Sequence, residues 1–379
     1  MKRKAWSPGR SGATGSTLPI GKVPVDLLRH LLARFAKSRD PCVVAGAGIG
    51  LDAAAIRIGS KVLVAKTDPI TFVADEIGTY ALLINANDLA AAGATPTWFL
   101  ATLLLPAHAT TPSYVTRLFE QLNTTCRRLR VSLCGGHSEI TDAVTRPVVV
   151  GCLLGECVPG KIVTAAGARV GDALLLTKGL AIEAVSILAR ERAEEIRRRH
   201  GTRFLAQCRR YLTKPGLSVL KEAQLALAAG GVHAMHDPTE GGLSSALYEM
   251  AEAAGVGLKI EADTIRVLPE AAQLCADFEL NPLGIIASGA LLITIDPAFE
   301  QRTLARLRTA RIPAARIGTV VPRRNGVTLI EDDRARPFPQ FAVDELANFF
   351  QRSPCDSRAS GAGVSAGTIV GIERLLRPS

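Results

Sequence analysis

Aromatic residues are scarce in this sequence: phenylalanine, tryptophan and tyrosine together make up 4% of its 379 residues. Proteins that bind single-stranded nucleic acid commonly stack the bases on such side chains. The formal net charge of +10 is typical of proteins that bind nucleic acid or phosphate groups. Because no stacking platform accompanies the charge, we expect no nucleic-acid partner.

Closely spaced cysteines are also missing. None of the 8 cysteines is paired in a Cys-x-x-Cys motif, which excludes a zinc ribbon and a thioredoxin-type redox site. Most of them lie in apolar runs, where cysteine behaves as a small buried hydrophobic residue. Such usage suits a reducing compartment.

Long apolar runs are absent as well. No segment approaches the roughly 18 apolar residues that a membrane-spanning helix needs. The basic N-terminal segment lacks the apolar core of a secretory signal. We therefore expect a soluble, cytoplasmic protein with no membrane association.

The sequence has no complete match to two common nucleotide-binding motifs. A Walker A loop needs glycine, four residues and then Gly-Lys-Ser/Thr, but the nearest candidate, from Gly15 to Lys22, has five intervening residues and continues with Val23. The glycines at 46, 48 and 50 do not complete Gly-x-Gly-x-x-Gly, because position 51 is leucine. Neither a P-loop nor a dinucleotide-binding loop is predicted.

The length of the chain and its alternating helix and strand patterns predict two α+β domains. We place the domains at residues 21–160 and 161–346, with mobile tails at 1–20 and 347–379. Hydrophobic periodicity predicts helices over 25–32, 77–92, 112–129, 218–229 and 242–254, and one long helix from 182 into an arginine-rich stretch. It predicts strands over 61–65, 98–105, 131–134, 147–154, 173–177, 256–260, 291–295 and 316–320.

Isolated acidic residues stand in glycine- or alanine-rich segments of the first half. Asp52 follows the Gly48–Gly50 turn, Asp68 ends a predicted strand, and Asp88 lies in an alanine-rich helix. Oxygen ligands of this kind suit Mg²⁺, which bridges carboxylates to phosphates. The alternative is that each aspartate caps a helix or a turn.

The second half contains the segment His233-Ala234-Met235-His236-Asp237-Pro238-Thr239-Glu240-Gly241-Gly242. It leads into a predicted helix, whose N-terminal backbone amides could hold an anion. The alternative is a helix N-cap formed by Thr239 or Asp237. The two histidines have no nearby cysteine or third histidine, so a transition-metal site is not expected.

Five motifs occur in a family-specific order. They are Gly-Ile-Gly-Leu-Asp-Ala-Ala at 48–54, Thr-Asp-Pro at 67–69, Asn-Asp-Leu-Ala-Ala-Ala-Gly-Ala-x-Pro at 87–96, Gly-Gly-His-Ser-Glu at 135–139 and Asp-Pro-Thr-Glu-Gly-Gly-Leu at 237–243. Over residues 20–345 the chain resembles the aminoimidazole ribonucleotide (AIR) synthetase-related superfamily. Within it, the chain is most similar to the hydrogenase-maturation-factor-like branch.

The resemblance implies a PurM-like two-domain fold, α+β to α/β in class. Its N-terminal sheet forms a barrel with a second copy in a homodimer, beside a C-terminal α/β domain. The resemblance also implies ATP and Mg²⁺ as cofactors and phosphorylation of an amide, carbamoyl or similar oxygen of a small substrate. The alternative is a nucleotide-binding accessory protein that works with a maturation-protein partner in metalloenzyme assembly.

The same resemblance assigns site residues. Metal ligands are expected at Asp52, Asp68 and Asp88, and catalytic side chains at Lys66, His137 and Glu139. Nucleotide contacts are expected at Gly48, Gly50, Asp52, Asp68, Asn87, Asp88, Gly135, Gly136, Asp237, Thr239, Gly241 and Gly242.

Three departures from the family pattern bear on the reaction. The cyanide-forming factors end in a reactive cysteine, whereas this chain ends Arg377-Pro378-Ser379 and its last cysteine is Cys355. The selenophosphate enzymes have a catalytic cysteine or selenocysteine near an N-terminal lysine, but no cysteine precedes Cys42 here. His137 stands where relatives have aspartate. We expect Cys355 to be dispensable, since Asp356 beside it disfavours a thiolate.

Overall fold

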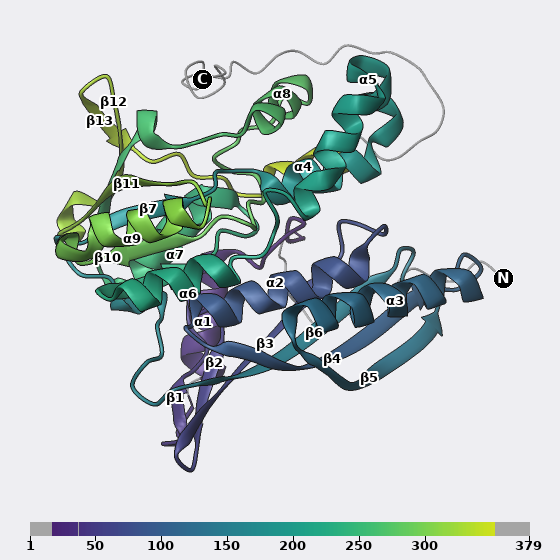
Figure 1. Ribbon diagram of the computed structural model, residues 1–379, viewed down its shortest axis with the longest axis horizontal. Helices are drawn as coiled ribbons and strands as arrows, with labels where there is room; N and C mark the ends of the chain where they lie inside the picture. Colours follow the sequence, from purple (N-terminus) through teal and green to yellow (C-terminus); the bar gives the residue numbers. More distant parts are fainter. Residues whose placement is uncertain (1–16, 37, 353–379) are drawn as a thin grey trace.

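The computed structural model describes residues 17–36 and 38–352, which build two β-sheets with their own helices (Figure 1). The strands of the first sheet lie within residues 43–157 and those of the second within 173–337. The predicted tail residues 1–16 and 353–379, with Cys355, lie outside the described residues. Among the described residues, no helix combines the length and apolarity needed to cross a membrane.

The N-terminal sheet has six strands in the order β1-β2-β3-β6-β4-β5. All neighbours run antiparallel except β4 and β5, which are parallel. The strands are β1 (Val43–Ala45), β2 (Ala54–Ile58), β3 (Lys61–Ile70), β4 (Thr95–Pro106), β5 (Ser132–Thr141) and β6 (Val148–Cys157). The helices of this half are α1 (Val25–Phe35), α2 (Ile77–Ala91) and α3 (Pro112–Leu129).

Helix α2 is the central element of the N-terminal half. All 15 of its residues are buried, as expected for a helix that is apolar on every side. Figure 1 shows α2 and α3 on one face of the sheet, with α2 between the sheet and the C-terminal half. Burial of the whole helix also places Asp88, which is 1% exposed, inside the protein.

The face of this sheet opposite α2 and α3 carries half-buried apolar side chains. Along β4 and β6, fully buried residues alternate with partly exposed ones, because successive side chains of a strand point to opposite faces. The partly exposed set includes Trp98, Leu100 and Leu104 on β4 and Val150 and Leu154 on β6. No described helix lies on this face in Figure 1.

The C-terminal sheet has seven strands in the order β13-β12-β9-β11-β7-β10-β8. They are β7 (Ala173–Thr177), β8 (Val232–His236), β9 (Gly257–Glu261), β10 (Leu292–Ile295), β11 (Ala314–Val321), β12 (Val327–Glu331) and β13 (Arg334–Pro337). The helices are α4 (Ile182–Glu191), α5 (Ala193–Arg209), α6 (Leu220–Ala229), α7 (Gly242–Ala254), α8 (Pro269–Asp277), α9 (Pro297–Thr309) and α10 (Glu345–Arg352). This confirms the predicted two-domain α/β fold class.

The two halves pack tightly against each other. One hydrophobic cluster contains residues of α2 and the N-terminal sheet together with residues of α4, α5 and α8. Across this contact, the Tyr80 hydroxyl of α2 donates to Ser186 Oγ of α4 at 2.6 Å. The functional groups of the two halves are therefore held in a fixed relationship.

Several predicted elements need correction. The strand predicted over 131–134 is longer than expected, because residues 135–139 continue it as β5, which pairs with β4 as far as Thr141. The expected long helix is two helices, α4 and α5, which meet at Arg192. Helix α10 extends through the boundary drawn at 347, because Leu346 and Ala347 pack in the interior.

Candidate active site

Lys66 joins two acidic side chains of the N-terminal half. Its Nζ lies 3.4 Å from Asp68 Oδ2, on the same strand, and 3.2 Å from Asp88 Oδ1 of α2. Burial opposes charge on Lys66, but Asp88 and Asp68 outweigh it and raise the pKa of the lysine. Lys66 is therefore held as a cation between Asp68 and Asp88, although burial raises the pKa of Asp88 well above its ordinary value.

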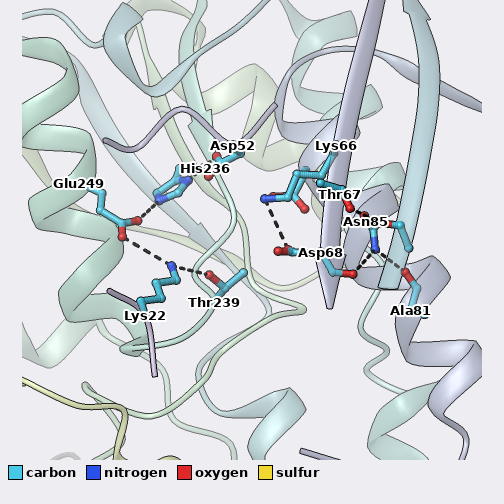
Figure 2. A network of polar contacts seen from close by, with 12 residues as sticks. Lys22, Asp52, Lys66, Thr67, Asp68, Ala81, Asn85, His236, Thr239 and Glu249 are labelled. Carbon is cyan, nitrogen blue, oxygen red and sulfur yellow. Dashed lines mark hydrogen bonds and ion pairs between the residues drawn. The ribbon is translucent and has the colours of Figure 1, made fainter. Parts of the chain in front are cut away.

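A second polar cluster joins the two halves of the protein. His236, at the end of β8, lies with Nδ1 2.6 Å from Asp52 Oδ2 and with Nε2 2.9 Å from Glu249 Oε2 of α7. Burial opposes charge on this imidazole, but Asp52 and Glu249 outweigh it and raise its pKa well above the ordinary value. A protonated ring donates to both carboxylates, and Figure 2 shows His236 between Asp52 and Glu249.

Lys22, from the N-terminal segment, also belongs to this cluster. Its Nζ donates to Thr239 Oγ1 at 3.2 Å and lies 3.5 Å from Glu249 Oε1. Burial opposes ionisation of Glu249, but Lys22 and His236 outweigh it and lower the pKa of that carboxyl to about 2. In Figure 2 the Lys22 and His236 group faces the Lys66 and Asp68 group across a gap.

Three buried carboxylate oxygens between these groups have no hydrogen-bond partner among the described residues. They are Asp88 Oδ2, Asp237 Oδ1 and Asp237 Oδ2. Burial raises the pKa of Asp237 to about 7, and the carboxylate of Asp52 adds to the shift. Buried carboxylates that lack donors are expected where a cation completes the site.

The arrangement fits Mg²⁺ through oxygen ligands. Ligand atoms of Asp52, His236 and Asp237 lie within 4.8 Å of one another. Both ring nitrogens of His236 already contact carboxylates, so Asp52 and Asp237 are the more suitable ligands. Asp68 and Asp88, the other two predicted metal ligands, lie beside Lys66, and their part in metal binding stays a prediction. The donor set therefore includes Asp237, which we had expected to contact the nucleotide.

Two backbone amides of the predicted anion site before α7 have partners within the protein. The Gly241 amide donates to Asp344 Oδ2 at 2.7 Å, and the Gly242 amide donates to Thr239 O at 3.0 Å. Asp344 thus takes the place of an anion at this helix start. Neither Thr239 nor Asp237 is the N-cap, which is Gly241 with a φ of 80°.

Two other predicted nucleotide contacts have structural roles. Both ends of the Asn87 side chain have partners within the protein, since Nδ2 donates to Leu217 O at 2.8 Å and Oδ1 accepts from Val219 N at 2.9 Å. Gly50 has a φ of 71°, and a Cβ there would lie 2.7 Å from Glu249 O. Glycine is required because the chain passes so close to α7.

His137 and Glu139 are not part of the cluster within one copy of the chain. They lie on the exposed edge strand β5, with Nε2 of His137 3.6 Å from Oε2 of Glu139. In the strand register, Asp68 of β3 lies opposite Gly151 of β6, which lies opposite Ala101 of β4. Ala101 in turn lies opposite Gly136 of β5. Three strand spacings of about 4.8 Å put β5 roughly 14 Å from Asp68. The catalytic roles of His137 and Glu139 remain predictions.

The remaining predicted residues lie at different distances from the cluster. Thr239 contacts Lys22 directly. Gly48 lies in the turn before Asp52, next to Leu51, and Gly135 lies with Gly136 on the edge strand. Sequence reasoning missed Lys22, His236 and Glu249 as parts of one site. The only local signal was His236 directly before Asp237 at a strand end.

Comparison with known proteins gives the family. The AIR synthase related protein N-terminal domain matches residues 50–157, and the corresponding C-terminal domain matches residues 169–330. A putative hydrogenase expression/formation protein of Methanocaldococcus jannaschii is 28% identical over 298 residues, covering 76% of this chain and 84% of that protein. Carbamoyl dehydratase HypE of Cupriavidus necator is 28% identical over 257 residues, covering 67% and 70%.

Solved structures share the fold. Hydrogenase maturation protein HypE in complex with ATP has a TM-score of 0.64 at 22% identity, covering 84% of this chain and 94% of that one. HypE in its complex with HypF has a TM-score of 0.64 at 18% identity, covering 76% and 93%. The two domain matches span more than half of the sequence, so this chain belongs to the AIR synthase related protein family.

Proposed function

We propose that this protein is an ATP- and Mg²⁺-dependent enzyme that phosphorylates an amide, carbamoyl or similar oxygen of a small substrate. The observation that carries the proposal is the buried set of unpartnered carboxylate oxygens on Asp88 and Asp237 beside the Lys66 cation. Such a set suits a metal–phosphate group. The likeness to carbamoyl dehydratase HypE supports the reaction class.

Each residue of the cluster has a distinct task in this proposal. Mg²⁺ bound by Asp52 and Asp237 would neutralise charge on the phosphates. Lys66 supplies a fixed cation for a phosphate oxygen, and Asp68 and Asp88 hold the lysine in place. His236 orients Asp52 through its 2.6 Å hydrogen bond. Phosphoryl transfer depends chiefly on this kind of positioning and charge neutralisation.

A homodimer is part of the proposal. The apolar sheet face with Trp98, Leu100 and Leu104 has no described cover, and the edge strand β5 exposes Ile140 to 57%. Exposed edges and apolar faces are normally covered in folded proteins. A second copy on this face would also bring its own His137 and Glu139 to the interface.

The alternative is a nucleotide-binding accessory protein that works with a maturation-protein partner, and the solved complex of HypE with HypF supports a partner of this kind. A cytoplasmic location belongs to both proposals. It is supported by the seven free cysteines among the described residues, which suit a reducing compartment. Turnover of ATP with a small substrate alone would favour the enzyme over the accessory protein.

Isothermal titration of the purified full-length chain with ATP tests the proposal. We expect binding with Mg²⁺, loss of at least about tenfold in affinity with a chelator, and a similar loss in Asp237→Asn with Mg²⁺ present. Asp172→Asn is a matched control, since Asp172 is a buried aspartate that pairs with His233 outside the cluster. Equal affinity with and without the metal would contradict the metal assignment.

A further inference from the structure

A cavity of about 420 Å³ opens beside the cluster, between the two halves of the protein. Lys22, Asp68, Thr239 and Glu240 line it on the side of the cluster. Most of the remaining wall is apolar, with Phe72 among its residues. Its volume is in the range of small-molecule sites. It is therefore the natural place for a substrate next to the proposed phosphoryl-transfer groups.

Two buried polar side chains in the wall of this cavity lack partners. Glu183, in the first turn of α4, is 4% exposed, and Ser288 is fully buried. Beyond the contact of the Ser288 hydroxyl with the Glu183 carboxyl, neither Glu183 Oε2 nor Ser288 Oγ has a hydrogen-bond partner within the described ranges. A buried polar atom without a partner costs about 1–3 kcal/mol, so a ligand that supplies the missing bonds would be favoured.

The surroundings of Glu183 favour the neutral form of its carboxyl. Burial raises the pKa of its carboxyl to about 8, and the carboxylates of Asp344, Glu240 and Asp237 add to the shift. The Ser288 hydroxyl opposes the shift without cancelling it. The one cation that lines the cavity in the described chain, Lys22, is paired with Glu249 and Thr239.

A protonated carboxyl presents one O–H donor beside one carbonyl acceptor. The complementary partner is a group with an adjacent acceptor and donor, such as a primary carboxamide or carbamoyl group. A carboxylate or phosphate has no hydrogen-bond donor for the carbonyl oxygen of the protonated Glu183 carboxyl. It would also meet the negative charge of Asp68 and Glu240 in the same cavity.

We propose that Glu183 and Ser288 form a subsite that holds an uncharged carboxamide-type group of the substrate. The subsite discriminates against anionic analogues of the same shape. This inference rests on the proposed function, because it places the amide in the cavity beside the phosphoryl-transfer groups. Glu183 acts here by binding and orienting the group.

The test uses ligand-observed NMR with benzamide and its charged isostere benzoate, on the full-length protein with Mg²⁺ and a non-hydrolysable ATP analogue. At about pH 6.5 we expect benzamide to bind the wild type roughly tenfold or more tightly than benzoate, the size expected for one or two hydrogen bonds. Glu183→Leu should lose this preference. The exposed Glu194→Gln on α5 is the matched control and should keep it.

Glu183→Gln identifies the titrating group. Glutamine presents the donor and acceptor of a neutral acid at any pH. At about pH 9.5, roughly one unit or more above the pKa of the Glu183 carboxyl, the wild type should therefore bind benzamide more weakly. Glu183→Gln should bind benzamide as well at this pH as at lower pH. Asp237, Asp344, Glu240 and Lys22 are unchanged in this variant, so loss of binding in both proteins would overturn the assignment.

The proposal and the underlying function can fail separately. Affinity for Mg²⁺–ATP is measured in the same samples and should be unchanged in Glu183→Gln. Normal nucleotide binding with equal or stronger binding of benzoate, or with no benzamide binding, would overturn the amide subsite alone. Absence of nucleotide binding would instead contradict the proposed function.

Discussion

The imidazole of His236 and the carboxylate of Asp52 form a 2.6 Å hydrogen bond between the two halves of the protein, with Glu249 on the other side of the ring. His236 is 2% exposed. A buried charge of this kind is stable only because both ring nitrogens have carboxylate partners. The contact fixes the C-terminal half against the segment between β1 and β2 of the N-terminal sheet.

Replacing His236 with glutamine should destabilise the fold by about 3–5 kcal/mol, the range for removing one partner of a buried charge network. The effect should depend on pH. Because the pKa of His236 is raised in the folded state, its stabilisation is complete below the unfolded pKa of about 6.5 and declines as pH rises through the folded value.

Urea denaturation of both proteins between about pH 6 and pH 9 measures this difference. His233→Gln is the control, since His233 lies on the same strand and pairs with Asp172 alone. We expect a smaller loss of unfolding free energy in the control. A His236→Gln penalty that grows with pH would show that the imidazole is neutral in the folded protein.

Replacing Lys66 with methionine should leave Asp68 and Asp88 without their shared cation. The expected loss of stability is about 3–5 kcal/mol near neutral pH and less in acid, where Asp88 is protonated. Added Mg²⁺ should raise the melting temperature of Lys66→Met more than that of the wild type, because the metal supplies the missing charge. Differential scanning calorimetry with and without the metal measures both effects.

Lys61→Met is the matched control for this variant. Lys61 lies on the same strand, but its side chain is 66% exposed and pairs with Glu156 at the surface. Its replacement should change the melting temperature little, as surface pairs contribute about 0–1 kcal/mol. Equal behaviour of the two variants would contradict the role given to Lys66.

Glu183 should make the wild type progressively less stable as pH rises. Its carboxyl keeps its proton in the folded state up to about pH 8, whereas the unfolded chain loses it near 4.5. The folded state therefore binds more protons across this window, so stability falls with increasing pH. Glu183→Gln removes this dependence.

The free energy of unfolding of Glu183→Gln relative to the wild type should rise from about pH 4.5 to about pH 8 and then level off. All other titrating groups are common to both proteins and cancel in the difference. Denaturation curves at matched pH values measure it. A constant difference would mean that Glu183 is ionised in the folded protein.

The open face of the N-terminal sheet should mediate dimer formation. Leu100 lies on this face, between Cys152 of β6 and Gly135 of β5 in the strand register. A charged side chain there cannot be buried against a second copy without a large desolvation cost. Leu100→Arg should sediment as a monomer at micromolar concentration, where the wild type sediments as a dimer.

Phe119→Arg is the control for the dimer prediction. Phe119 is 44% exposed on α3, which lies on the opposite face of the sheet. This variant should remain dimeric. A wild type that sediments as a monomer and still binds Mg²⁺–ATP would contradict the proposed assembly.

Much of the local structure follows from the sequence alone. Helix 112–129 and strand 173–177 were predicted with the bounds that the structure has, because hydrophobic periodicity and nearby glycine and proline act over a few residues. The family motifs similarly indicated the residues around Asp52, Asp68, Asp88 and Asp237. These features depend on neighbours in the chain.

The grouping of those residues was decided by tertiary structure. Glu249 has no local signal, and it reaches His236 only because α7 packs beside the end of β8. Asp344 accepts a hydrogen bond from the backbone amide of Gly241, although the two residues are more than 100 positions apart in the sequence. The glycines of the Gly-Gly-His-Ser-Glu motif are not typical of a strand, and the motif is part of β5 because it pairs with β4. Hydrogen bonds and charge pairs of this kind depend on distance in space, which residue spacing does not contain.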